Sequence, residues 1–176
     1  MQNLFDTVTA WLDARIDAVM KRTRRRPLPT GQLTETEARL KAAGRNTARD
    51  HLLARTDVCA LEALSKSCVL AEWTGARIHI VHESSALSLP YIRWFKSRGV
   101  DLTVETLPQY LLLSMDDVEA PRGAALRMNP PIRDAHHQAP LWDALVSGLI
   151  DMIATDHAPH GPGEKTGERI WDIACG

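Results

Sequence analysis

The chain has 176 residues, of which 44% are hydrophobic and 24% are charged, and its formal net charge is −1. This is the size and composition of one globular domain, with enough apolar side chains to bury a core. The balanced charge gives no field that would favour nucleic acid or an anionic membrane, and no apolar run is long enough to span a bilayer. The three cysteines lack paired metal-ligand spacing and no secretory signal opens the sequence, so we expect reduced thiols in a cytoplasmic protein.

The N-terminal quarter of the chain is predicted to form helices and a basic loop. Apolar residues recur at spacings of three and four over residues 4–21, which predicts an amphipathic helix. The basic run at residues 21–26 could bind nucleic acid, but in a chain of balanced charge it is more often a solvated helix end. A proline- and glycine-containing loop is predicted at residues 27–31, and Thr34 is expected to cap a second helix that ends near Gly44.

The remaining residues, 45–176, are predicted to form strand and helix units. Residues 45–56 are polar and predicted to be irregular, and a loop is predicted at residues 108–110. Helical patterns cover residues 57–74, 86–98 and 139–147, and short apolar stretches typical of buried strands cover residues 77–82, 100–106 and 152–154. Helical connections between short buried strands predict a parallel sheet. Three such strands are about three-eighths of a (β/α)₈ barrel, so we predict an α/β fold, a partial TIM-like barrel that forms one domain over residues 1–176.

Polar side chains follow each of the three predicted strands. They are His82 after the first, Glu105 and Thr106 at the end of the second, and Asp156, His157 and His160 after the third. Because the carboxyl ends of parallel strands meet at one edge, we expect these side chains to share one face. Imidazole and carboxylate groups are good ligands for zinc or manganese, although an Asp-His pair can also simply cap a turn. A metal held there would lower the pKa of a bound water to about 7, and a nearby carboxylate could move its proton.

Other histidines and cysteines are interpreted as structural. His79 is expected to be a buried or partner-facing core residue, and His136 with His137 a solvated loop pair. His51 has no partner nearby in sequence and is expected to have no chemical role. Cys59 and Cys68 lie on helix faces and are most simply core residues.

Four motifs carry a resemblance to a known family. They are His-Ile-Val-His-Glu-Ser-Ser at 79–85, Glu-Thr-Leu-Pro-Gln-Tyr-Leu at 105–111, Asn-Pro-Pro-Ile-Arg at 129–133 and Ala-Thr-Asp-His-Ala-Pro-His at 154–160. Their order and approximate separations resemble the dihydroorotase, hydantoinase and allantoinase group of cyclic amidohydrolases. The resemblance covers residues 45–176 and implies strands six to eight of a metal-dependent hydrolase barrel.

The resemblance also implies roles for individual residues. His82 matches a metal ligand at the end of the sixth strand, and Asp156 matches the eighth-strand aspartate that binds metal and acts as general base and acid. Asn129 and His160 match substrate-contacting positions. Cys175 and Gly176 stand where the family has a substrate-contacting Phe-Gly pair, with Cys175 in place of the aromatic residue.

The implied reaction is hydrolysis of a cyclic amide C–N bond. A metal-activated hydroxide would attack the ring carbonyl, and Asp156 would pass the proton to the departing nitrogen. The implied cofactor is zinc, binuclear in a complete enzyme, and the implied partner is a small cyclic amide or ureide. Asn129 and His160 favour a dihydroorotase-like ring and residues 108–110 a hydantoinase-like one, with an allantoinase-like ring also open.

Several family features have no counterpart in this sequence. It contains no His-x-His motif of the first strand, no lysine in the context of the carboxylated fourth-strand residue and no fifth-strand histidine. Three interpretations follow. The chain is a fragment of a longer enzyme, which we favour; it pairs with a polypeptide that carries the missing N-terminal barrel half, or with copies of itself; or it is a non-catalytic half-barrel that acts as a binding or assembly module.

Overall fold

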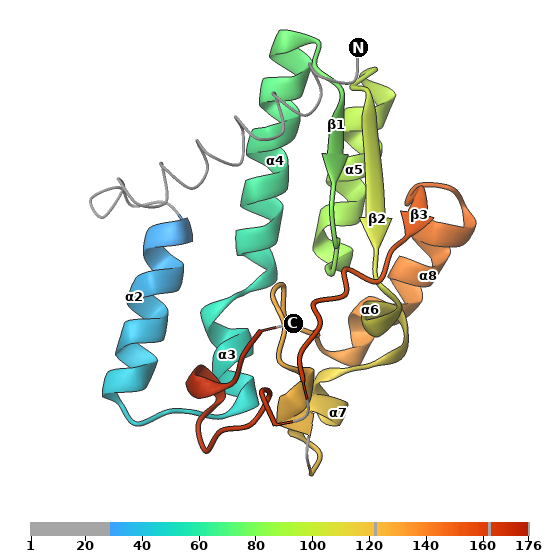
Figure 1. The fold of residues 1–176 in the computed structure, drawn as a ribbon. Coiled ribbons are helices and arrows are strands. Elements are labelled where there is room, and N and C mark those ends of the chain that lie inside the picture. The colour runs from blue at the N-terminus through green and yellow to red at the C-terminus, as the bar shows by residue number, and fades with distance from the viewer. Residues whose placement is uncertain (1–28, 122, 162, 176) are drawn as a thin grey trace.

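The structure is a computed structural model that describes residues 29–121, 123–161 and 163–175 (Figure 1). The helix predicted at residues 4–21, the basic run at 21–26 and Gly176 lie outside the described residues. The helices are α2 (Pro29–Ala42), α3 (Ala48–Ala54), α4 (Asp57–Thr74), α5 (Leu89–Ser97), α6 (Pro108–Leu112), α7 (Met115–Glu119) and α8 (Gln138–Val146). The strands are β1 (Ile78–Ile80), β2 (Leu102–Thr106) and β3 (Met152–Ile153). Short 3₁₀ turns are η1 (Ala86–Ser88), η2 (Gly123–Leu126), η3 (Ala135–His137) and η4 (Ile170–Asp172).

The three strands form one parallel sheet in the order β1-β2-β3. Ile78 pairs with Leu102 in the first ladder, and Glu105 pairs with Met152 in the second. Helix α5 connects β1 to β2, and α8 lies on the connection from β2 to β3 (Figure 1). The predicted parallel sheet with helical crossovers is therefore confirmed.

The core lies between one face of this sheet and the helices. Along β2, Leu102, Val104 and Thr106 are buried, whereas Thr103 and Glu105 on the opposite face are only half-buried. The buried face packs with side chains from three helices, namely Cys68 of α4, Ile92 and Phe95 of α5, and Leu141 of α8. Burial of each large apolar side chain stabilises the fold by about 1.5–3 kcal/mol. The apolar face of β2 therefore holds the strand in the core, and its polar face is not needed for packing there.

Local sequence signals explain where most elements begin and end. Helix α4 follows the predicted range and ends at Gly75, whose φ of 70° suits a residue without a Cβ. The Ser85 hydroxyl accepts a hydrogen bond from the Leu87 N–H and starts η1, which runs into α5. Ser114 and Asp117 form a capping box at the start of α7.

Several sequence-based expectations about secondary structure were wrong. The helix expected to start at Thr34 begins at Pro29 instead, where a loop was expected. The stretch 45–56 is not irregular throughout, because Thr47 and Asp50 form a capping box that starts α3. Residues 108–110 begin helix α6, with proline at its first position.

The third strand is shorter and more exposed than expected. Met152 and Ile153 are 43% and 48% exposed rather than buried, because β3 pairs with β2 alone in the described part of the chain. Its start is held by Asp151, whose Oδ2 accepts hydrogen bonds from the Val104 N–H at 2.8 Å and from Lys96 Nζ at 2.7 Å. In the described part of the chain, β3 is therefore an edge strand whose apolar side chains are left partly uncovered.

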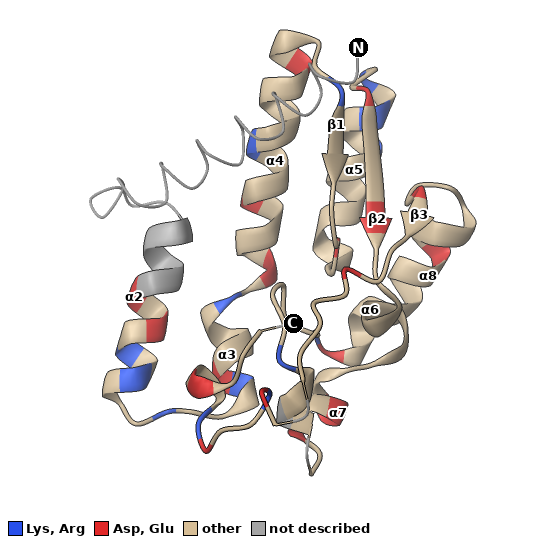
Figure 2. Ribbon diagram, in the orientation of Figure 1, with Lys and Arg blue, Asp and Glu red and all other residues tan. Residues whose placement is uncertain are grey.

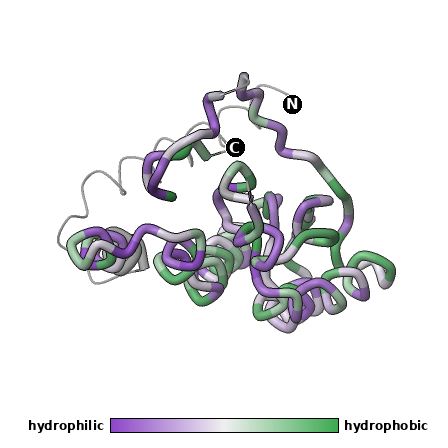
Figure 3. Tube along the Cα trace, turned by 90° about the horizontal axis from the view of Figure 1, so that it is seen from below, coloured by the Kyte–Doolittle hydropathy of each residue, from purple (hydrophilic) through white to green (hydrophobic). Residues whose placement is uncertain are grey.

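Charged residues of both signs are spread over the described part of the chain (Figure 2). Acidic and basic residues are interspersed over the helices and loops (Figure 2). The segment after β3 is largely hydrophilic and swings away from the packed helices before it returns (Figure 3). None of the described helices is long and apolar enough to cross a membrane.

Candidate active site at the carboxyl ends of the strands

His82 and Asp156 follow the two outer strands of the sheet. His82 comes two residues after β1 and Asp156 three residues after β3, and both strands run parallel to the β2 strand between them. Both residues have a left-handed backbone, with φ of 43° at His82 and 45° at Asp156. This conformation is uncommon for residues with a Cβ and costs of the order of 1–3 kcal/mol, and such strain concentrates at functional sites. The two predicted metal ligands thus each have a left-handed backbone just beyond a strand, at one edge of the sheet.

The polar face of the sheet supports the turn at His82. The His82 N–H donates to Glu105 Oε1 at 3.2 Å, and Glu105 Oε2 lies 3.2 Å from His79 Nε2. His79 Nδ1 lies 2.8 Å from Thr103 Oγ1. His79 is half-buried and belongs to a hydrogen-bonded row on the face opposite the core, and this row ends at the backbone of His82.

The described residues do not gather a complete set of metal ligands. In residues 29–121, 123–161 and 163–175, no group of three or more His, Cys, Asp or Glu side chains is close enough to hold a metal ion. Zinc takes three or four protein ligands, and an imidazole and a carboxylate are suitable members of such a set. His82 and Asp156 therefore fit zinc in donor type, but further ligands would have to come from elsewhere.

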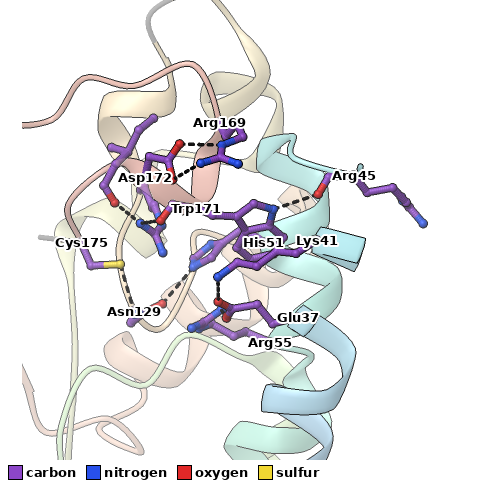
Figure 4. Close-up of polar contacts among 12 residues, drawn as sticks. Glu37, Lys41, Arg45, His51, Arg55, Asn129, Arg169, Trp171, Asp172 and Cys175 are labelled. Atoms are coloured by element: carbon purple, nitrogen blue, oxygen red, sulfur yellow. Dashed lines mark hydrogen bonds and ion pairs between the residues drawn. The ribbon is translucent and has the colours of Figure 1, made fainter. Parts of the chain in front are cut away.

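A second group of predicted residues is brought together, of which Figure 4 shows Asn129 and Cys175. Asn129 Nδ2 donates to Cys175 Sγ at 3.2 Å, and His160 Nε2 lies 2.8 Å from the Cys175 carbonyl oxygen. These residues come from three separate segments of the chain, and their predicted common role as substrate contacts requires them to meet. Gly176, the fourth predicted contact, lies outside the described residues.

His51 also belongs to this group, although the sequence indicated no partner for it. Its Nε2 lies 3.1 Å from Asn129 Oδ1, and the residue is only 3% exposed. Burial, together with the positive charges of Arg55 and Arg127, lowers the pKa of His51 to about 4. The Thr47-x-x-Asp50 capping box was the one local signal that could have placed His51 on a helix.

The C-terminal segment is tied onto α2 and α3 by Trp171. Its indole N–H donates to the Arg45 carbonyl at 2.8 Å, and its ring meets the His51 ring edge-on at 6.2 Å between centroids (Figure 4). The Lys41 ammonium lies 5.2 Å from the Trp171 ring centroid. Arg127 donates to the carbonyl oxygen of Ile173 in the same segment. These contacts place Cys175 beside Asn129.

A buried polar cluster fixes the chain that follows His82. Glu83 is buried and accepts a hydrogen bond from the Ser85 N–H at 2.7 Å, while Arg133 donates to Ser84 Oγ at 3.0 Å. Burial raises the pKa of Glu83 despite these partners. His137 is buried too and accepts from the Ala86 N–H at 3.0 Å, so the predicted solvated pair is wrong for His137, although His136 is exposed.

Sequence comparison with known proteins identifies relatives of this chain. An allantoinase from Deinococcus radiodurans is 40% identical over 144 residues, which are 82% of this chain and 31% of that protein. A dihydroorotase from Streptomyces coelicolor is 42% identical over 112 residues, which are 64% of this chain and 26% of that protein. The chain is a relative of the cyclic amidohydrolases. No protein-family model matches it.

Solved structures of cyclic amidohydrolases share the fold. A D-hydantoinase (dihydropyrimidinase) from Thermus sp. has a TM-score of 0.78 at 29% identity, over 83% of this chain and 33% of that one. An L-hydantoinase (dihydropyrimidinase) from Arthrobacter aurescens has a TM-score of 0.75 at 28% identity. The predicted family and the predicted partial α/β barrel are confirmed. The chain spans about a third of the length of the curated relatives it matches.

Proposed function

We propose that this chain forms part of the active site of a metal-dependent hydrolase that opens a cyclic amide or ureide ring, within a longer enzyme. The observation that carries the proposal is that His82 and Asp156, each with a left-handed backbone, follow parallel strands at the same edge of the sheet. Similarity to proteins named allantoinase, dihydroorotase and hydantoinase supports this reaction class.

Each residue has a proposed role. His82 and Asp156 would contribute ligands to a divalent metal, zinc, which when bound supplies a nucleophile at neutral pH. Asp156 takes up the proton released in the attack on the ring carbonyl and delivers it to the departing ring nitrogen, because a carboxylate at that edge can act as base and then as acid. Asn129, His160 and residues 175–176 contact the substrate ring.

The preferred substrate is a dihydroorotate-like or allantoin-like ring, and a hydantoin-like ring is the alternative. The Tyr110 of the hydantoinase-like motif is buried and its hydroxyl donates to the Pro130 carbonyl at 2.8 Å, so it braces the segment next to Asn129. This structural use of Tyr110 is compatible with any of the three rings. Assays with dihydroorotate, allantoin and hydantoin would separate them.

The test uses the protein that contains this chain, loaded with zinc. Asp156→Asn is expected to abolish turnover on all three substrates while the protein stays folded. Asp116→Asn, which alters an exposed carboxylate on α7, is the matched control and should leave turnover unchanged. Turnover that survives in Asp156→Asn would reject Asp156 as the base.

A non-catalytic assembly module is the second candidate function. The observation in its favour is that the described residues do not gather three metal-binding side chains. On this hypothesis β1 and β3, which each pair with β2 alone in the described part, accept the strands of a barrel half carried by another polypeptide or another copy of this chain. Stoichiometric zinc uptake that is lost in both His82→Gln and Asp156→Asn would favour the hydrolase, and partner binding without zinc would favour the module. We propose a cytoplasmic location for either function.

A further inference from the structure

The side chain of Asn129 has two hydrogen-bonding ends, and each end has a partner. The oxygen Oδ1 faces His51 Nε2 at 3.1 Å, and the nitrogen Nδ2 faces Cys175 Sγ at 3.2 Å (Figure 4). An amide presents either an acceptor or a donor to its surroundings, depending on which end is held. A donor that binds Oδ1 therefore leaves the NH₂ group of Asn129 as the hydrogen-bond donor on the opposite side.

His51 is suited to hold that oxygen. It is neutral near pH 7, because it is buried and lies near the positive charges of Arg55 and Arg127. A neutral imidazole has one N–H donor and one acceptor nitrogen, and only the form with the proton on Nε2 can donate to Asn129 Oδ1. The observed contact therefore corresponds to the tautomer with its proton on Nε2, and this tautomer holds the amide in the orientation that points Nδ2 towards Cys175.

The surroundings hold His51 itself in place. It lies on α3 directly after the Thr47–Asp50 capping box, and Arg45 forms a 2.6 Å ion pair with Asp50. The Trp171 ring meets the imidazole edge-on. Packing against the Trp171 ring and attachment to a capped helix restrict the His51 ring to one position. A residue that orients another side chain needs such a fixed position.

We propose that His51 is a positioning residue that orients the Asn129 amide, so that Asn129 presents its NH₂ group to an acceptor oxygen of the substrate. This inference rests on the proposed function, because the substrate contact belongs to that site. In the structure the NH₂ group of Asn129 donates its hydrogen bond to Cys175 Sγ, and a thiol is a weak acceptor. A ring carbonyl or carboxylate oxygen of the substrate is a stronger acceptor and would replace it. The substrate atom recognised by Asn129 is therefore an acceptor oxygen and not a ring N–H.

Two substitutions of His51 separate orientation from folding. His51→Phe keeps a ring beside Trp171 but removes the donor, and is expected to raise KM by about tenfold with kcat little changed, the effect of one lost hydrogen bond. His51→Gln places an amide N–H near the position of Nε2 and should restore most of the KM. His136→Gln, at an exposed histidine, is the control and should match the unsubstituted protein.

A second measurement needs no turnover. The ¹⁵N spectrum of the histidine-labelled protein should show His51 protonated on Nε2 and not on Nδ1 at pH 7. The side-chain amide signals of Asn129 should shift in His51→Phe and return towards their original positions in His51→Gln. His51 protonated on Nδ1 alone, or Asn129 signals that do not change in His51→Phe, would overturn the inference whether or not the protein is an enzyme.

The kinetic outcomes also distinguish the two proposals. A protein in which Asp156→Asn keeps its turnover contradicts the proposed function, while the spectra still decide the orientation of Asn129. A protein that loses turnover in Asp156→Asn but has the same KM in His51→Phe supports the hydrolase and contradicts the role of His51. An equal fall of kcat in His51→Phe and His51→Gln, with KM unchanged, would show that His51 serves only the fold and would also overturn the inference.

Discussion

Glu105 Oε1 accepts a hydrogen bond from the backbone N–H of His82 at 3.2 Å, across the parallel pair β1 and β2. The other carboxylate oxygen lies 3.2 Å from His79 Nε2, so the carboxylate bridges a side chain and a backbone on the neighbouring strand. His82 has a left-handed backbone, and this bond is one restraint that keeps it there. The Glu105 carboxylate thereby helps to hold the backbone of His82, a candidate metal ligand, in its observed conformation.

This relationship predicts that Glu105 affects metal binding without being a ligand. Glu105→Ala should weaken zinc binding by about 10- to 100-fold, the usual effect of losing a group that orients a ligand. Glu105→Gln keeps an oxygen acceptor and should lose less. Competition with a chromophoric chelator measures the affinity. Equal affinities in Glu105→Ala and the unsubstituted protein would contradict the prediction.

The buried histidines predict a stability that depends on pH. Burial lowers the pKa of His51 and of His137 to about 4, whereas the ordinary pKa of a histidine, which applies in the unfolded chain, is 6.5. Below pH 6.5 the unfolded chain binds protons that the folded chain does not, so stability falls from about pH 6.5 down to about pH 4 and is retained above that window. For the nearly inaccessible His51 the loss is up to about 3 kcal/mol.

Urea unfolding between pH 4 and pH 8 checks this prediction. His51→Gln should flatten the pH dependence, because one of the two depressed groups is removed. Replacement of the exposed His136 by glutamine should leave the curve unchanged. If the free energy of unfolding depends on pH in the same way in His51→Gln and in the unsubstituted protein, the pKa of folded His51 is not lowered.

The end of helix α4 predicts a backbone effect. Gly75 has a φ of 70°, and a Cβ added there would meet no heavy atom within 4 Å. Gly75→Ala should therefore destabilise the fold by about 1–2 kcal/mol through the left-handed backbone alone. Gly161→Ala, where φ is not positive and the added Cβ makes ordinary contact with Glu164, should change stability by less than about 0.5 kcal/mol. The free energy of unfolding in urea gives both values.

The packing behind the sheet predicts a core effect. Leu141 of α8 is fully buried in the cluster that also contains Val104 of β2. Leu141→Ala should cost about 2–5 kcal/mol, because it leaves a cavity as well as losing buried area. Val146→Ala on the same helix removes an 83% exposed side chain and should be nearly neutral. Thermal unfolding of the two variants gives the comparison, and similar losses would contradict the assigned core.

Much of this fold was open to prediction from sequence because its signals are local. The wide apolar face of residues 57–74 and the glycine after it predict α4, and short β-branched runs predict β1 and β2. The third strand was misjudged, because an apolar run looks the same whether its faces are covered or exposed, as Met152 and Ile153 are. Helix α3 was missed because its short polar sequence lacks a periodic apolar face.

The sequence by itself determined the family, the parallel strand and helix order and the two candidate ligands His82 and Asp156, because motifs and periodicity are carried by neighbouring residues. Only the tertiary structure decided which distant residues meet. His51 and Asn129 are separated by 78 positions in sequence, and their side chains touch only because α3 and the C-terminal segment fold over the same loop. Such a contact depends on how buried surfaces pack, and no local pattern encodes it.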